Sequence, residues 1–170
     1  MELLIPGLLL VALMVYLSTK IKKKAAKAYE REMFVGKGFS VIKPEGFISP
    51  TDIGELAFAA YSKEFGSDEC ENLRRVSAEA RIFYGETLED VVHQRLGTSS
   101  KTGEAKPFDN KVRIIEREEE AEGCAYSAIY KFIEGEKTAT YELAIKFLPD
   151  QKDEFLQKIN EMLDTFILEG

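Results

Sequence analysis

The hydrophobic pattern divides this chain into two unlike parts. The run from Leu3 to Leu17 contains fifteen residues without a charge, and the basic segment 20–24 follows it closely. Beyond residue 36, apolar and polar residues alternate instead, as they do in half-buried strands. The pattern therefore predicts an apolar helix followed by a single α+β domain.

Short alternating stretches and two helical stripes predict the elements of that domain. Thr87 stands three residues before Asp90, a spacing close to a capping box at the start of a helix. Pro149 ends the last strand, and Asp150 is a candidate N-cap for the closing helix. The order β-β-β-α-β-β-β-α predicts an antiparallel sheet with helices packed on it. The expected strands are 39–43, 55–61, 73–84, 112–117, 124–133 and 138–148, and the expected helices are 87–96 and 151–168.

The apolar run is interpreted as a transmembrane anchor. Residues 1–21 are long enough to span a bilayer if the lysine stems reach up to the interface. Glu2 precedes the run and the lysines follow it, which reverses the charge order of a cleaved secretory signal, the main alternative. The side chains assigned to the membrane are Leu3, Leu4, Ile5, Leu8, Leu9, Leu10, Val11, Leu13, Val15, Tyr16 and Leu17, and those assigned to lipid head groups are Lys20, Lys22, Lys23 and Lys24.

Charge bias predicts the orientation of this single-pass protein. The lysine-rich flank of a membrane helix stays in the cytoplasm, so the domain is expected there. Cys70 and Cys124, with no second pair of cysteines, are interpreted as reduced thiols of a cytosolic domain. A periplasmic or lumenal domain is the alternative. The expected boundaries are 1–21 for the anchor, 22–35 for a basic helical stalk and 36–170 for the domain.

The net charge of −7 hides an asymmetry. Residues 1–31 hold six Lys or Arg and two Glu, a charge of +4, so the remainder carries −11. The basic part suits anionic lipid head groups. The acidic body offers no basic stripe for phosphates, and nucleic acid is not expected as a partner.

No constellation of residues predicts catalysis. His93 is the only histidine and has no second ligand for a metal, and the cysteines lack a C-x-x-C partner. The segment 97–103 resembles a phosphate loop but has its lysine before the second glycine, against the Walker order. The glutamates of 116–122 are interpreted as a solvated turn rather than a cation site. Neither a metal nor a cofactor is therefore expected, and the protein is predicted not to be an enzyme.

Two groups of residues are candidates for binding. The polar stretch 97–110 is longer than most loops and is either a plain surface loop or a contact for a partner, through Lys101, Lys106 and Phe108. Tyr126, Tyr130 and Tyr141 fall on inward-facing strand positions. They either belong to the core or line a cavity between the sheet and the closing helix.

The start of the domain resembles the PsbP-like family, whose fold is shared by the extrinsic photosystem II subunit and the Ran-release factors. The resemblance rests on Gly38-Phe39-Ser40-Val41 followed by Pro44-Glu45-Gly46-Phe47, and on the placement of the helix 87–96 and of a closing helix that ends at Asp164-Thr165-Phe166. It spans residues 36–168. Members of this family are mostly non-enzymatic and bind larger assemblies or partner proteins. The N-terminal anchor departs from the family, many of whose members are exported.

The sequence as a whole predicts a membrane-anchored, non-catalytic accessory subunit. Its acidic domain is expected to contact partner proteins, and its N-terminal helix is expected to contact lipids. The alternative is a carrier that holds a small molecule or lipid between the sheet and the closing helix.

Overall fold

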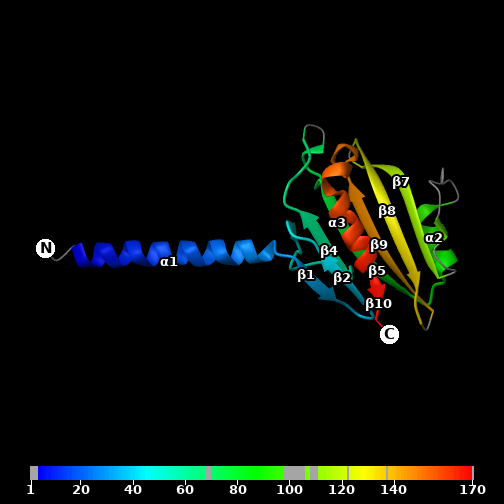
Figure 1. Ribbon diagram of the computed structural model, residues 1–170, viewed down its shortest axis with the longest axis horizontal. Coiled ribbons are helices and arrows are strands. Elements are labelled where there is room, and N and C mark those ends of the chain that lie inside the picture. Colours follow the sequence, from blue (N-terminus) through cyan, green and yellow to red (C-terminus); the bar gives the residue numbers. More distant parts are fainter. Residues whose placement is uncertain are drawn as a thin grey trace.

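The computed structural model describes residues 4–67, 70–97, 106–107, 111–121, 123–136 and 138–169. A long helix, α1 (Leu4–Ala28), extends away from a domain of two antiparallel sheets and two helices (Figure 1). The smaller sheet has the order β1-β2-β10, with β1 at Glu32–Val35, β2 at Phe39–Lys43 and β10 at Ile167–Leu168.

The larger sheet has the order β3-β4-β5-β9-β8-β7-β6. Its strands are β3 (Phe47–Ile48), β4 (Phe58–Ser62), β5 (Val76–Tyr84), β6 (Lys106–Pro107), β7 (Val112–Ala121), β8 (Cys124–Glu134) and β9 (Ala139–Phe147). The helices of the domain are α2 (Leu88–Leu96) and α3 (Lys152–Thr165), the latter preceded by a 3-10 turn, η2 (Pro149–Gln151).

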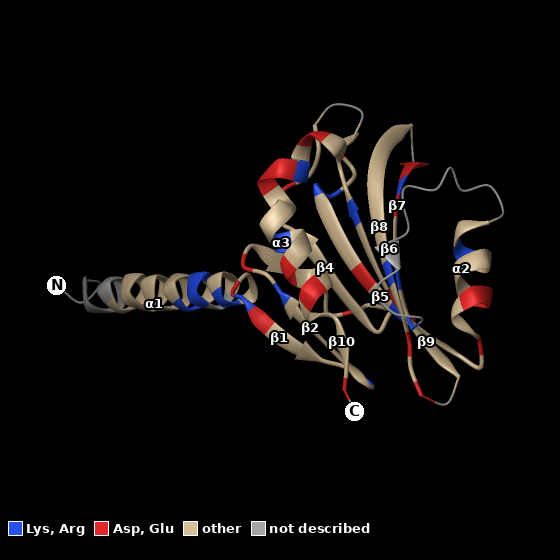
Figure 2. Ribbon diagram, turned by 45° about the vertical axis from the view of Figure 1, so that its right-hand side comes forward, with Lys and Arg blue, Asp and Glu red and all other residues tan. Residues whose placement is uncertain are grey.

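Both faces of the larger sheet are covered. Side chains alternate between the two faces along each strand, so Leu143 and Ile145 of β9 lie in the core under α3 and the smaller sheet, while Ala144 packs under α2. Phe155 and Ile159 of α3 fill the first core. The domain therefore has three layers, with the larger sheet in the middle (Figure 2).

The predicted α+β class is confirmed, and several elements fall where the sequence places them. β2 occupies 39–43, and β8, which is apolar on both faces, lies between β9 and β7 inside the sheet. Thr87 caps α2 as expected, because its side-chain oxygen accepts a hydrogen bond of 3.3 Å from the backbone N–H of Asp90.

Other elements correct the sequence prediction. There are two sheets instead of one, because β1 and β10 pair with β2. The helix expected to continue through the stalk to residue 35 ends at Ala28. The closing helix ends at Thr165, whose hydroxyl oxygen accepts a hydrogen bond of 3.0 Å from the N–H of Ile42. The acidic run 116–122 is not a turn through most of its length, since β7 continues to Ala121. Pairing with β2 thus overrides local helix propensity at both ends of the domain.

The end of α1 is fixed to the domain by a buried lysine. The ammonium of Lys43 on β2 donates a hydrogen bond of 2.8 Å to the carbonyl of Ala28, the last residue of α1, and lies 3.3 Å from a carboxylate oxygen of Glu32. The N–H of Gly46 donates to the carbonyl of Tyr29, and Arg31 pairs with Glu161 on α3. The predicted basic helical stalk is therefore shorter than 22–35.

The helices that the structure describes contradict the predicted single-pass membrane localisation. None of them is long and apolar enough to cross a bilayer. The head-group contacts assigned to Lys20, Lys22, Lys23 and Lys24 stay predictions.

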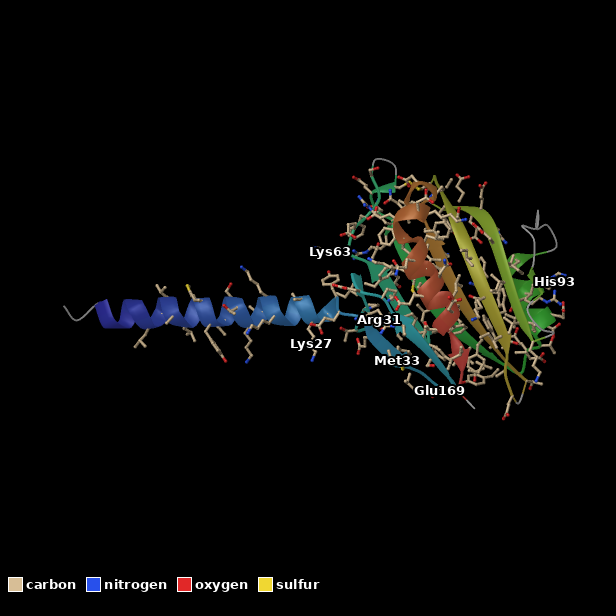
Figure 3. The ribbon with its side chains drawn as sticks, viewed as in Figure 1. Lys27, Arg31, Met33, Lys63, His93 and Glu169 are labelled. Atoms are coloured by element: carbon tan, nitrogen blue, oxygen red, sulfur yellow. A yellow bond between two sulfur atoms is a disulfide. The ribbon has the colours of Figure 1, made fainter. Side chains whose placement is uncertain are left out.

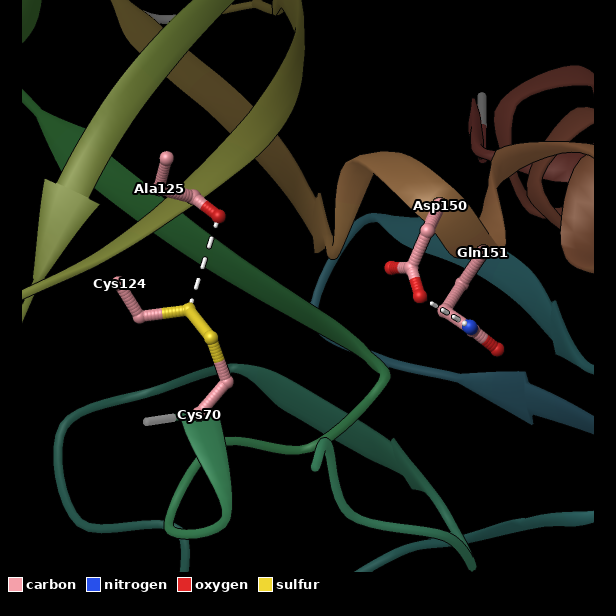
Figure 4. The surroundings of a disulfide bond; sticks show 5 residues. All are labelled: Cys70, Cys124, Ala125, Asp150 and Gln151. Carbon is pink, nitrogen blue, oxygen red and sulfur yellow. Dashed lines mark hydrogen bonds between the residues drawn. A yellow bond between two sulfur atoms is a disulfide. The ribbon is translucent and has the colours of Figure 1, made fainter. Parts of the chain in front are cut away.

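A disulfide joins Cys70 and Cys124, whose Cα atoms are 5.6 Å apart (Figure 4). The prediction of two reduced thiols is therefore wrong, and the support that the cysteines gave to a cytoplasmic domain is lost. Cys70 lies in the connection between β4 and β5, which passes over the start of β8, so the fold brings together two cysteines that are 54 positions apart. Such a bond is typical of an oxidising compartment.

Candidate functional site

A groove opens between the C-terminal end of α3 and the neighbouring ends of β7, β8 and β9. Its volume is about 990 Å³. β10 forms one wall, and the turn between β8 and β9 forms another. The residues that line it are Gly38, Tyr84, Lys111, Val112, Ile114, Lys131, Ile133, Glu134, Gly135, Glu136, Ala139, Tyr141, Leu163, Asp164, Phe166, Ile167, Leu168 and Glu169.

The floor of the groove is held together by Lys131 of β8. Its ammonium donates hydrogen bonds to the carbonyl oxygens of Leu163 (2.5 Å) and Phe166 (2.9 Å), at the end of α3. Burial lowers the pKa of Lys131 below its ordinary value, while the charge of Asp164 acts in the opposite direction. These bonds satisfy carbonyls that the end of a helix leaves without partners.

The ring of Tyr141 is held between two glycines. A Cβ atom at Gly38 would lie 2.6 Å from the hydroxyl oxygen of Tyr141, and one at Gly135 would lie 2.6 Å from its Cε2 atom. Gly38 also has a φ of +82°, which other residues rarely adopt. Any larger residue at these two positions would therefore displace Tyr141 and reshape this wall of the groove.

The rim of the groove is acidic. Glu134, Glu136, Asp164 and Glu169 are exposed carboxylates, and Lys111 is an exposed cation. Glu169 lies directly after β10, at the end of the domain opposite η2 (Figure 3). The groove thus combines an apolar floor, built from residues such as Val112 and Ile114, with a negatively charged border.

The three candidate tyrosines do not share a cavity. Tyr141 lines the groove, whereas Tyr126 and Tyr130 lie on the opposite face of the sheet, beside α2. Their hydroxyl groups donate hydrogen bonds of 2.7 and 2.6 Å to Glu119, whose carboxylate also lies 2.9 Å from Arg117.

Glu119 and its tyrosines shift one another's pKa values. Burial and the hydrogen bond to Glu119 raise the pKa of Tyr126 to about 12, and the same causes raise the pKa of Tyr130 further. Burial alone would raise the pKa of Glu119, but the two hydrogen bonds and Arg117 outweigh it, so that pKa lies below its ordinary value. The tyrosines stay neutral and serve as donors to a charged carboxylate.

A fully buried carboxylate, that of Glu142 on β9, lies on the same face. Arg95 of α2 donates two hydrogen bonds to it, of 2.9 and 3.2 Å, and Arg81 of β5 lies 3.5 Å away. The hydrogen bond to Glu142 raises the pKa of Arg95, against the opposing effect of burial. The sequence does not single out this pair, because Glu142 alternates with core residues along β9 and only the packing of α2 covers its face.

The remaining candidate residues fall outside the groove. His93 is exposed on α2, on the side of the domain away from α1 (Figure 3). Lys101 and Phe108 lie outside the described residues, and Lys106 belongs to the short strand β6, which pairs with β7. In the described part of the chain, no three His, Cys, Asp or Glu side chains come together as metal ligands would.

Comparisons with solved structures identify the fold. The Ran-binding protein Mog1p of Saccharomyces cerevisiae aligns with a TM-score of 0.54 and 12% identity, over 82% of this chain and 96% of that one. LpqN of Mycobacterium tuberculosis is a protein involved in cell envelope biogenesis. It aligns with a TM-score of 0.55 and 10% identity, over 83% of this chain and 91% of LpqN. A crystal structure of a protein from Bacteroides thetaiotaomicron aligns with a TM-score of 0.51 and 15% identity, over 84% of this chain and 49% of that one. The chain thus spans about half the length of the Bacteroides protein.

At sequence identities this low, the alignments show that the proteins share a fold, and they do not show a shared function. The expected likeness to the fold of the Ran-release factors is confirmed by Mog1p. The solution structure of cyanobacterial PsbP from Synechocystis aligns with a TM-score of only 0.45, which is too low to support an argument. No family model matches the sequence, and no curated protein matches it.

Proposed function

We propose that the domain is a non-catalytic binding subunit that holds a segment of a partner protein in the groove beside β10. The observation that carries this proposal is the groove itself, which combines an apolar floor, half-exposed side chains and about 990 Å³ of space. A concave site of this volume with an apolar floor is typical of a binding site.

The absence of reaction chemistry is part of the proposal. Among the described residues, the two buried charged groups are engaged: Lys43 with the carbonyl of Ala28 and with Glu32, and Glu142 with two arginines. The half-buried Lys131 and Glu119 are engaged as well, Lys131 with two carbonyls and Glu119 with two tyrosines. A general acid or base has to reach a substrate with a free lone pair or proton. Groups already satisfied in this way suit a structural role better than a catalytic one. The similarity in fold to Mog1p, a Ran-binding protein, also supports a binding role.

Size-exclusion chromatography of an extract from cells that make this chain tests the proposal. The chain is expected to elute in a complex larger than itself. Ile114→Lys, which places a charge on the groove floor, is expected to release it from that complex. Val92→Lys on α2 is the matched control, because Val92 is also half-buried but lies on the other face of the sheet. Elution of all three chains at the size of the free protein contradicts the proposal.

A carrier of a small apolar molecule is the second candidate, because the groove volume lies within the range of ligand pockets. Native mass spectrometry of the purified chain distinguishes the two functions. A small-molecule adduct that is present in the native chain and absent after Ile114→Trp supports the carrier. A chain without an adduct that still elutes in a larger complex supports the binding subunit.

A further inference from the structure

Leu168 lines the groove and belongs to β10, which is an edge strand of the smaller sheet among the residues that the structure describes. β10 is the last strand in the order β1-β2-β10, and the N–H of Glu169 donates to the carbonyl of Gly38 on the side of β2. Phe39, which lies opposite Leu168, uses its carbonyl to accept from Gly36 on the side of β1. Because backbone groups alternate along an antiparallel pair, the N–H and C=O of Leu168 point away from β2.

The floor of the groove suits the side chains of a strand added at this edge. A strand directs alternate side chains to the same face, so every second residue of an added segment would meet the sheet below. The side chains available to it there are the half-buried, apolar Val112, Ile114 and Leu163. Peptide recognition by strand addition works in this way, with backbone bonds providing affinity and side-chain pockets providing selectivity.

The rim selects the charge of that segment. Four exposed carboxylates, Glu134, Glu136, Asp164 and Glu169, border the groove, while Lys131 already donates to two carbonyls. Lys111 is the exposed cation of the lining. Complementary charge at a rim favours a partner of the opposite charge and disfavours one of the same charge. An anionic segment would be repelled by this border.

We propose that the groove binds an extended segment of the partner in which apolar residues alternate with Lys or Arg, paired as an added strand with the outer edge of β10. This inference rests on the proposed function and names the chemistry of the partner.

Fluorescence anisotropy with the full-length chain tests it, and the probe is a labelled octapeptide of alternating Val and Lys. Three comparison peptides replace Lys by Glu, replace Val by Ser, or carry N-methyl groups on alternate residues, which block strand pairing. The Val–Lys peptide is expected to bind at least about tenfold more tightly than each of the three. Equal binding of the Ser–Lys or the N-methylated peptide overturns the proposal, because charge alone would then explain the affinity. Equal binding of the Val–Glu peptide overturns it as well.

Matched variants localise the binding. A triple variant that combines Glu134→Gln, Glu136→Gln and Glu169→Gln is expected to bind the Val–Lys peptide about tenfold more weakly. The control variant combines Glu45→Gln, Glu55→Gln and Glu64→Gln, which make the same change in net charge at exposed positions outside the groove. It is expected to bind the peptide within about twofold of the affinity of the native chain. Equal losses in the two triple variants overturn the proposal. If no peptide binds while Ile114→Lys still releases the chain from its complex, this inference fails and the proposed function stands.

Discussion

The ammonium of Lys131 lies 2.9 Å from the carbonyl oxygen of Phe166. This contact joins the centre of the larger sheet to the end of α3, directly before the strand that forms one wall of the groove. The end of α3, which borders the groove, is therefore held by a half-buried lysine whose hydrogen bonds are made to the backbone.

Lys131→Met is expected to destabilise the domain by about 1–3 kcal/mol, because the carbonyls of Leu163 and Phe166 lose their donor. Urea unfolding measures the change. Lys146→Met is the control, since Lys146 is a half-buried lysine on the other face of the sheet that lies over the ring of Tyr126. Equal losses in the two variants would argue against a special role for Lys131.

The same lysine predicts a pH dependence. Its folded-state pKa is lowered by burial, so the folded protein releases this proton before the unfolded chain does. Stability should therefore rise with pH between the folded-state pKa and the unfolded value near 10.5. Subtracting the pH profile of Lys131→Met from that of the native protein isolates this contribution. A difference that falls with pH in this window contradicts the assignment.

Tyrosine titration tests the Glu119 cluster. Tyr126 is expected to ionise near pH 12 and Tyr130 above it, and Glu119→Gln should lower both pKa values because it removes a negative acceptor. The raised values contribute stability that is complete below the unfolded pKa of 10.0 and is lost as the pH rises through 12. The absorbance of tyrosinate follows the titration. Glu118→Gln, at an exposed neighbouring position of β7, should leave it unchanged.

Removal of Arg95 should cost more than removal of an exposed partner. Arg95→Ala leaves the fully buried carboxylate of Glu142 with only the more distant Arg81 and is expected to destabilise the domain by about 3 kcal/mol. Arg95 is itself about one-third exposed, which places the cost at the lower end for a buried pair. Arg31→Ala, which breaks the exposed pair with Glu161, should cost less than about 1 kcal/mol. Thermal unfolding compares the losses of stability in the two variants. Equal losses would contradict the role of Arg95 on α2 as the main partner of Glu142.

Reduction should weaken the fold. In the chain-entropy model, a disulfide between residues 54 positions apart stabilises the folded state by about 4 kcal/mol. A reducing agent is therefore expected to lower the urea midpoint of the native chain. The double variant Cys70→Ala, Cys124→Ala should unfold at that lower midpoint with or without reductant. Insensitivity of the native chain to reductant would mean that the bond does not form in solution.

The alternating strands and the α2 cap could be predicted from the sequence because their signals are local. β5 and β9 show a period of two residues, and Thr87 lies at capping distance from Asp90. The pairing of β1 and β10 with β2 could not be predicted, because β10 has only two residues and β1 follows a segment that favours helix. In each case tertiary hydrogen bonds decide the conformation.

The site was harder to predict than the fold. The groove draws residues from β7, β8, β9, α3 and β10, and no spacing along the chain connects Ile114 with Leu168. The disulfide was missed because the spacing of two cysteines does not determine whether they meet. The burial of Glu142 could not be predicted, because a strand pattern shows two faces without showing what covers each.

Photo-cross-linking tests the central claim most directly. A benzoylphenylalanine at position 114, on the groove floor, is expected to give a discrete adduct with a partner segment that carries Lys or Arg, and excess Val–Lys peptide should suppress that adduct. The same group at position 93, exposed on α2, should give none. An adduct from position 93 alone, or equal yields from the two positions, would contradict the assignment of the groove as the binding site.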